Sequence, residues 1–246
     1  MRFAFLLGIS CLAVAFVARA DAPAEPIRLT MGWHVTIDTQ GHPTDLEAIP
    51  NPRTDRVPQI HEALEREIRT WTFNPGLVNG KPAITQTALI LAISVLPQSA
   101  TNASIRVDHA DTGGWYAKVT PPKYPPSAVS AHKVGLVVLK VDYDESGKVT
   151  AAVPAPGTPD VAASLTNASV ATVRKWTFAP EVVGGHAMAG AAYVPFCYSL
   201  SNMPGSLRNP PCDWTPPGRS TSIGDGDALA INPVATLATD VAGRML

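Results

Sequence analysis

Two Trp-Thr-Phe triplets, 105 positions apart, constrain this chain more than any other feature. They span Trp71–Phe73 and Trp176–Phe178, and a proline follows each triplet two positions later, at Pro75 and Pro180. A turn dipeptide then follows in each case, Asn79-Gly80 in the first copy and Gly184-Gly185 in the second. An internal repeat of this kind indicates that one small structural unit occurs twice along the chain.

Each triplet closes an amphipathic helical stretch, and an alternating strand pattern precedes that stretch. Apolar residues alternate with polar ones in the first copy, which is typical of a half-buried strand; they are Leu29, Met31, Trp33, Val35 and Ile37. Ile60, Leu64, Ile68 and Trp71 then recur on one helical face. A shift of 106 places the second copy's apolar residues Val137, Leu139, Val141 and Tyr143 in the same phase. The predicted fold class is therefore α+β, with two tandem small units of antiparallel sheet plus helix.

These patterns divide the chain into segments. The first unit covers residues 27–97 and the second unit covers residues 115–200. Between them, residues 98–114 are polar and are predicted to form a linker, with at most a short edge strand at Ile105 and Val107. Residues 201–246 form a Pro/Gly-rich tail, whose apolar stretch from Ala228 to Leu237 is expected to dock on a unit as either helix or strand.

The N-terminus has the pattern of an export signal. Arg2 precedes an apolar run from Phe3 to Val17, and Ala18-Arg19-Ala20 fits a small-x-small cleavage site. We therefore predict a cleavable signal peptide at residues 1–20 and export of the protein. The alternative is a retained membrane anchor, although the run is shorter than the ~20 residues that span a bilayer.

Composition excludes one class of partner. The 19 basic and 20 acidic residues give a net charge of −1, and charged residues make up 16% of the chain. Nucleic-acid binding needs a basic surface to neutralise phosphates, so no nucleic-acid partner is expected. The apolar fraction of 46% is ample for a packed core.

Beyond the predicted signal peptide the chain has only two cysteines, Cys197 and Cys212. In an exported chain the simplest interpretation is a disulfide between them. Two free thiols are the alternative. A metal site is disfavoured because no histidine lies at ligand spacing from either sulfur.

A series of motifs runs in order through the second unit: Pro122-Lys123-Tyr124-Pro125-Pro126-Ser127-Ala128, Val134-Gly135-Leu136-Val137, Asp144, Gly147, Val149, Trp176-Thr177-Phe178-Ala179-Pro180, Gly185 and Val194-Pro195-Phe196. Through these residues the second unit resembles the TonB C-terminal domain family, and the resemblance implies a periplasmic location for the exported protein, or an inner-membrane anchor if the N-terminal segment is retained. The first unit looks like a degenerate copy that lacks the Pro-x-Tyr-Pro opening. The resemblance implies a small antiparallel sheet packed on a helix. It also implies a periplasmic role, in which such domains grip a short peptide of outer-membrane receptors and pass on inner-membrane energy.

No catalytic, cofactor-binding or metal-ligating constellation is found in the sequence. The six histidines are scattered, and no Gly-x-Ser-x-Gly elbow is present. An enzyme is therefore not predicted.

The candidate site is a sheet edge, whose unpaired backbone groups can accept an extended peptide. We assign it to Val194, Phe196 and Tyr198, with Leu89, Leu91 and Ile93 as the corresponding run in the first unit. Pro195 lacks an N–H, which favours an edge position for this last strand.

Two functional hypotheses follow. In the first, an exported binding protein engages an extended peptide or protein partner by strand addition, in connection with TonB-type transport across the outer membrane. In the second, the protein is a structural or self-associating envelope protein whose edges are buried within the molecule. A retained N-terminal segment would instead favour an anchored energy transducer.

Overall fold

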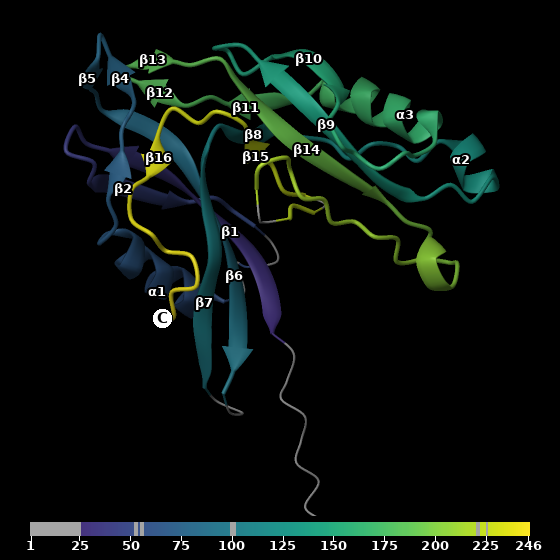
Figure 1. Cartoon of the computed structure of the whole chain (residues 1–246), viewed down its shortest axis with the longest axis horizontal. Helices are drawn as coiled ribbons and strands as arrows, with labels where there is room; N and C mark the ends of the chain where they lie inside the picture. Colours follow the sequence, from purple (N-terminus) through teal and green to yellow (C-terminus); the bar gives the residue numbers. More distant parts are fainter. Residues whose placement is uncertain (1–25, 52–53, 55–56, 99–101, 220–221, 225) are drawn as a thin grey trace, which may run out of the picture.

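The computed structural model describes residues 26–51, 54, 57–98, 102–219, 222–224 and 226–246. The predicted signal peptide at residues 1–20 lies outside this part of the chain. The elements combine short helices with antiparallel sheets (Figure 1), which agrees with the α+β prediction. In chain order they are β1 (Ile27–Ile37), β2 (Pro43–Ala48), α1 (Pro58–Ile68), β3 (Phe73–Asn74), β4 (Leu77–Val78), β5 (Lys81–Pro82), β6 (Thr85–Pro97), β7 (Ala103–Gly113), β8 (Trp115–Lys118), α2 (Pro126–Ser130), β9 (Gly135–Tyr143), β10 (Val149–Pro154), α3 (Ala163–Val173), β11 (Thr177–Ala179), β12 (Val182–Val183), β13 (His186–Ala187), β14 (Gly190–Tyr198), the 3-10 helix η1 (Gly205–Leu207), β15 (Leu229–Ala230) and β16 (Thr236–Leu237).

The first sheet is built around β6, which pairs with β1 on one side and with β7 on the other. The full strand order is β13-β12-β6-β1-β2, with β7 joined to β6 off this path. The alternation predicted for β1 is confirmed, because Met31, Trp33, Val35 and Ile37 are all buried on one face. This face packs against α1, whose Leu64 and Ile68 are fully buried together with Trp71.

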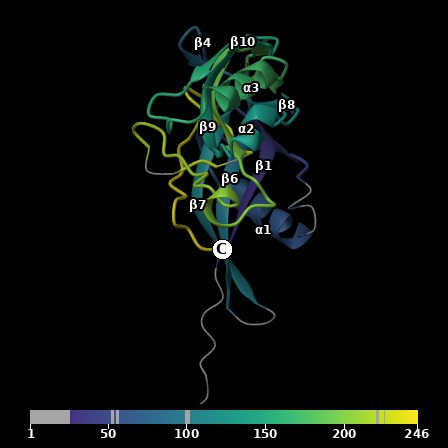
Figure 2. The same cartoon turned by 90° about the vertical axis from the view of Figure 1, so that its right-hand side faces the viewer.

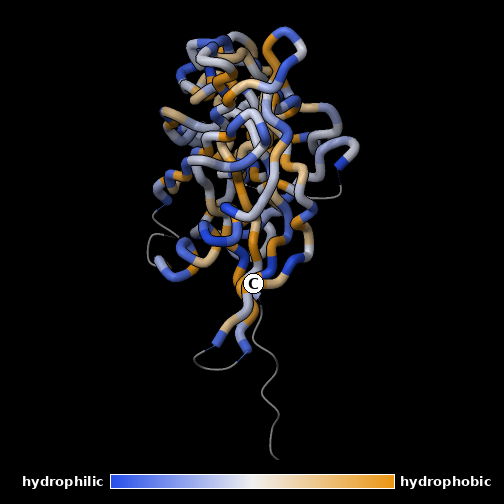
Figure 3. The backbone as a smooth tube through the Cα atoms, turned by 90° about the vertical axis from the view of Figure 1, so that its left-hand side faces the viewer, coloured by the Kyte–Doolittle hydropathy of each residue, from blue (hydrophilic) through white to orange (hydrophobic). Residues whose placement is uncertain are grey.

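The second sheet has the order β10-β9-β14-β15, and α3 covers one of its faces. Its first three strands repeat the order β2-β1-β6 of the first sheet. In Figure 2 the elements β9, β10 and α3 of the second unit lie above α1 and the labelled part of the first sheet formed by β1, β6 and β7. Figure 3 shows hydrophobic segments mainly in the interior and hydrophilic ones mainly in the outer turns.

The repeated triplets are tied to the repeated turns by the same contact in both units. The N–H of Phe73 donates to the carbonyl of Gly41, and the N–H of Phe178 donates to that of Gly147, both at 2.8 Å. Both glycines have positive φ, at 88° and 78°, a conformation that favours glycine. A Cβ on either one would collide with the phenylalanine carbonyl oxygen. The glycine turn and the triplet therefore form one local structure.

The predicted linker at residues 98–114 is wrong in its central part. Residues 103–113 form β7, which pairs with β6 over ten positions. Ile105 and Val107 do face the core, as a short strand would require. Asp108 forms a β-bulge between Val107 and His109. The bulge interrupts the alternation of apolar and polar residues, so the sequence does not show the pattern of one long strand.

The tail contacts both units and is largely irregular. Its β15 pairs with β14 in the second unit, and its β16 pairs with β3 in the first. The final residues 243–246 hydrogen-bond to β7, so the C-terminus lies beside β7 and α1 (Figure 1). The apolar stretch from Ala228 to Leu237 therefore docks as two short strands rather than as a helix.

The two units are also joined by strand pairing. The hairpin strand β12 comes from the second unit but adds to the beginning of β6 in the first sheet, where Val182 pairs with Gln86 and Val183 with Thr85. The expectation of two units connected by a linker is thus replaced by two sheets, of which the first includes strands from the second unit and both pair with the tail or contact it.

Candidate partner-binding edge

The side chains of the predicted edge residues lie in the core. Val194, Phe196 and Tyr198 are 0%, 4% and 3% exposed and face α3. The ring of Phe196 lies 5.3 Å from that of Trp176, and the Tyr198 hydroxyl lies 2.9 Å from the Ser169 hydroxyl. These side chains are therefore not available to a partner, and only the backbone of β14 faces its outer edge.

Along β14 the backbone groups alternate between β9 and the outer edge. The N–H of Ile231 donates to the carbonyl of Ala191 at 2.9 Å, and Tyr193 pairs with Leu229. Ala191 and Tyr193 therefore direct their backbone outward, and Pro195 is the next residue in this series. Pro195 has no N–H to donate, so a ladder along this edge loses a hydrogen bond there. The observed pairing with β15 covers only Ala192 and Tyr193.

The tail is fastened beside this edge by a disulfide and an indole ring. The structure confirms the predicted bond between Cys197 and Cys212, whose Cα atoms are 5.6 Å apart. Trp214 packs edge-on against Tyr193 with ring centroids 5.0 Å apart, and its Nε1–H donates to the carbonyl of Gly157 at 3.1 Å. These contacts hold the tail on the sheet face opposite α3.

The corresponding edge of the first unit is occupied. Leu89, Leu91 and Ile93 are fully buried, and their strand β6 lies between β1 and β7. The strand predicted as a second candidate edge is therefore an interior strand. The residues that cover it come from the segment predicted to be a linker.

A buried carboxylate, which sequence reasoning missed, joins the two units and the tail. Glu181 is 5% exposed, and its Oε1 accepts hydrogen bonds from the Thr87 hydroxyl at 2.8 Å and the Ala235 N–H at 3.2 Å. Its Oε2 accepts one from the Val234 N–H at 2.7 Å. Burial raises the pKa of Glu181, and these three donors oppose the increase. Burial and the nearby carboxylate also raise the pKa of Tyr143 to about 12.

No sequence signal marks this junction, because a single glutamate after the Trp-Thr-Phe-Ala-Pro run resembles any loop residue. Its three donors come from distant segments, the start of β6 and the tail. The pairing of β12 with β6 places Glu181 beside Thr87, and the pairing of the tail strands β15 and β16 brings Val234 and Ala235 to the same carboxylate.

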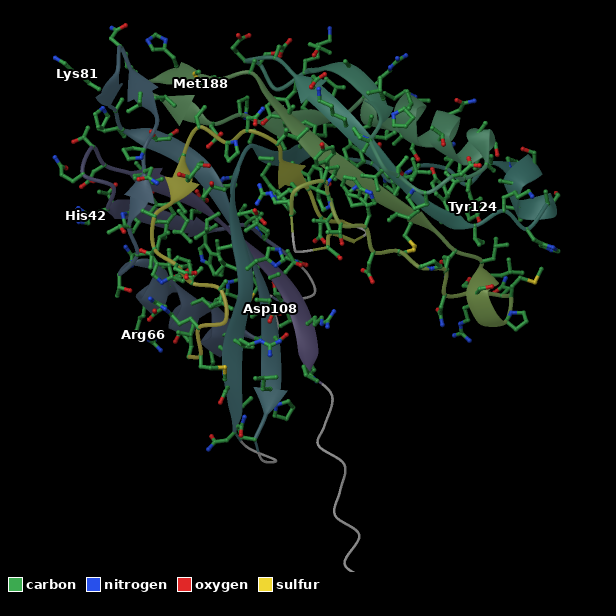
Figure 4. All side chains as sticks on the ribbon, in the orientation of Figure 1. His42, Arg66, Lys81, Asp108, Tyr124 and Met188 are labelled. Atoms are coloured by element: carbon green, nitrogen blue, oxygen red, sulfur yellow. A yellow bond between two sulfur atoms is a disulfide. The ribbon has the colours of Figure 1, made fainter. Side chains whose placement is uncertain are left out.

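A cleft of about 450 Å³, lined by both polar and apolar residues, lies between the outer face of the first sheet and the tail. Three of its charged residues, Arg106, Asp108 and Asp111, take part in ion pairs. Arg106 donates to Asp108 at 2.8 Å, and Arg219 donates to Asp111 at 3.0 Å. Asp108 projects from β7 in Figure 4. Within the described ranges, no group of three His, Cys, Asp or Glu side chains could hold a metal ion, and no helix is long and apolar enough to cross a membrane.

The sequence comparisons match the part of the chain that contains β14. The model of the family described as Gram-negative bacterial TonB protein C-terminal matches residues 120–200. Residues 120–200 belong to the TonB C-terminal domain family. Two curated proteins named Protein TonB, from Xanthomonas campestris pv. campestris strains B100 and ATCC 33913, are each 36% identical over 83 residues. The matched region is 34% of this chain and 36% of each relative, so this chain spans about a third of their length. No solved structure matches the chain significantly.

The opening motif of the TonB C-terminal domain has a structural role here. Tyr124 stacks edge-on against Tyr198 at the end of β14, with centroids 5.2 Å apart, and its hydroxyl donates to the carbonyl of Lys133. Pro126 begins α2, where a missing N–H costs nothing. The motif thus holds α2 against the end of β14. Figure 4 labels Tyr124 at this position.

Proposed function

We propose that the second unit is a binding module that takes an extended segment of a protein partner along the outer edge of β14. By its family, the partner is a segment of an outer-membrane receptor, and the protein is an accessory of TonB-type transport. The observation that carries the proposal is β15, a segment distant in sequence that already adds antiparallel to this edge at Ala192 and Tyr193. An edge that accepts one strand offers the backbone geometry for another.

Binding of this kind depends on backbone groups more than on side chains. The side chains of Val194 and Phe196 are committed to the core. Specificity must therefore come from the opposite face of the sheet, where Leu136 and Val138 meet the tail. A partner strand with alternating apolar residues would fit this face.

A titration with isotope-labelled protein tests the proposal. Synthetic peptides from the periplasmic N-terminal segments of outer-membrane receptors are added up to millimolar concentration, and backbone chemical shifts are recorded. Shifts that concentrate on β14 and β15 support strand addition. The matched control is the same peptide with alternate amides N-methylated, which keeps the side chains and removes the donors. Equal binding of both peptides, or no shift at millimolar peptide, contradicts the proposal.

A second candidate is a structural envelope protein whose edges are buried internally. It is favoured by β6, which has partner strands on both sides, and by residues 243–246, which hydrogen-bond to the far edge of β7. Under this candidate the amides of β14 resist hydrogen exchange as strongly as those of β6. Faster exchange at Tyr193 than in the middle of β6 argues against it.

We also propose that residues 27–97 are a diverged copy of the second unit. The shared strand order and the matching contacts of Gly41 with Phe73 and Gly147 with Phe178 support this proposal.

We further propose that residues 1–20 are a cleaved export signal. The disulfide supports export, since such bonds persist in oxidising compartments. N-terminal sequencing of the exported protein tests the signal: a chain that begins at Asp21 supports cleavage, and one that retains Met1 favours an anchored energy transducer.

A further inference from the structure

The outer edges of β6 and β14 are equivalent positions in the two sheets, and this chain adds a strand of its own to each. On β6 the added strand is β7, which is antiparallel and pairs from Ala88 to Pro97. On β14 the added strand is β15, which is also antiparallel but pairs only at Ala192 and Tyr193. The same edge is thus filled by a long ladder in one sheet and by a short one in the other.

The two added strands are held by different means. β7 is held along its length by backbone pairing with β6. β15 has two paired positions, and the tail around it is held by the bond from Cys197 to Cys212 and by apolar packing. Trp214, Ile223 and Leu229 form a small cluster with Leu136 and Val138 of β9, separate from the core under α3.

Pro195 gives a physical reason for the short ladder. It is the next residue of β14 whose backbone faces outward beyond Tyr193, and it has no N–H. At Ala228 the tail leaves the edge, and Gly226 just before it adopts positive φ, at 88°. A strand of two residues contributes few hydrogen bonds, so its attachment depends on the contacts that flank it. The disulfide and Trp214 hold the chain before it, and the hydrogen bonds of Val234 and Ala235 to Glu181 hold the chain after it.

We propose that the strap, defined as Cys212, Trp214, Ile223, Leu229 and Ala230, is a tethered internal competitor for the edge of β14. This inference rests on the proposed function. The strap must leave the edge before a partner strand can add, because both use the outward backbone groups of Ala191 and Tyr193. Tethering gives the strap a high effective concentration at the edge, so a free partner competes at a disadvantage.

The strap also sets the chemistry of the partner. Leu136 and Val138 are 1% and 0% exposed beneath the strap. A partner that displaces the strap must cover them with apolar side chains of its own, or the exchange uncovers apolar surface. The matching ligand is an extended segment with at least one large apolar side chain directed toward β9, as Leu229 is in the strap.

The test uses the full chain and a probe taken from the strap itself. The probe is a fluorescent synthetic peptide with the sequence of residues 226–233. Two variants release the strap in different ways: C197S/C212S removes the covalent tether, and W214A removes the indole packed on Tyr193. Arg244→Ala is the control, because Arg244 holds another part of the tail on Glu67 of the first unit. Hydrogen exchange of the Tyr193 amide reports whether the strap has left, and thermal melting confirms that each variant is folded.

We expect the probe to bind each strap-released variant about tenfold more tightly than the native chain or the Arg244→Ala control, which corresponds to a strap open about a tenth of the time in the native chain. Equal affinity for native and released chains overturns the inference and leaves the proposed function standing. If neither the probe nor the receptor peptides bind variants whose Tyr193 amide has become exchangeable, both the inference and the proposed function are overturned. A Tyr193 amide that stays protected in both variants overturns the role given to the disulfide and Trp214.

Discussion

The carboxylate of Glu181 lies 2.8 Å from the hydroxyl of Thr87, and this contact spans the boundary between the two units. Two N–H groups of the tail, from Val234 and Ala235, bind the same carboxylate. Three segments far apart in the sequence therefore meet at one buried side chain. The junction therefore links the first unit, the second unit and the tail.

Replacement of this side chain should destabilise the whole molecule. Glu181→Ala leaves three donors without their acceptor, the buried Thr87 hydroxyl and Ala235 N–H and the partly buried Val234 N–H, and each unsatisfied buried group costs about 1–3 kcal/mol. We expect the free energy of unfolding to fall by about 3 kcal/mol or more, measured by urea denaturation. Glu145→Ala is the matched control, since Glu145 is exposed in the Asp144 turn, and it should change stability by less than about 0.5 kcal/mol. Similar losses in the two variants would contradict the role of the junction.

The pH dependence of stability should carry the signature of Glu181. Burial raises the folded-state pKa of this carboxyl above its unfolded value, so its contribution to stability is fully present below the unfolded pKa. That contribution is lost as the pH rises through the folded pKa. As the pH rises through the folded-state pKa, the native chain should therefore lose unfolding free energy relative to Glu181→Gln. Urea denaturation of both proteins at a series of pH values measures it, and a difference that is constant with pH would contradict the prediction.

The Gly147 turn should not tolerate a side chain. Gly147 has φ of 78°, and a Cβ there would collide with the carbonyl oxygen of Phe178. We expect Gly147→Ala to lower the free energy of unfolding by about 3 kcal/mol, because left-handed strain of about 1–2 kcal/mol adds to the collision. Gly185→Ala is the control, since Gly185 has φ of 84° and nothing within 4 Å of its Cβ position. It should lose only the strain, and thermal or urea denaturation of the two variants separates the effects.

The disulfide should contribute measurably to stability. Cys197 and Cys212 are 15 positions apart, and closing a loop of this length stabilises by about 3 kcal/mol in the chain-entropy account. A reducing agent should therefore lower the melting temperature of the native chain and leave that of C197S/C212S unchanged. Mass spectrometry that finds two free thiols in periplasm-derived protein would refute the bond.

The end of the tail should stabilise the first sheet locally. The N–H groups of Ile105 and Val107 donate to the carbonyls of Leu246 and Arg244. Truncation after Thr239 removes these acceptors together with Val241, which is buried in the first core, and it keeps the hydrogen bonds of Val234 and Ala235 to Glu181. Hydrogen exchange should then accelerate at Ile105 and Val107, while the amides of β9 keep their protection. Unchanged exchange in β7 would show that the tail is dispensable there.

The sequence alone determined the features that depend on neighbouring residues. The alternation from Met31 to Ile37 specified β1, and the spacing of Leu64, Ile68 and Trp71 specified the buried face of α1. The triplets and their paired turns marked the repeat, and the scarcity of cysteines specified the disulfide. These signals are readable because strand and helix periods are imposed by local backbone geometry.

The tertiary structure alone decided how edges and polar groups are used. Residues 103–113 appear polar because the outer face of β7 holds Arg106 and Asp108 and a bulge breaks its alternation. The strand-to-strand contacts of β12 with β6 and of β15 with β14 involve backbone groups that every residue possesses. Glu181 finds its donors only after those strands have paired. Backbone pairing between distant segments leaves little trace in side-chain pattern, so the occupied edges could be known only from the folded chain.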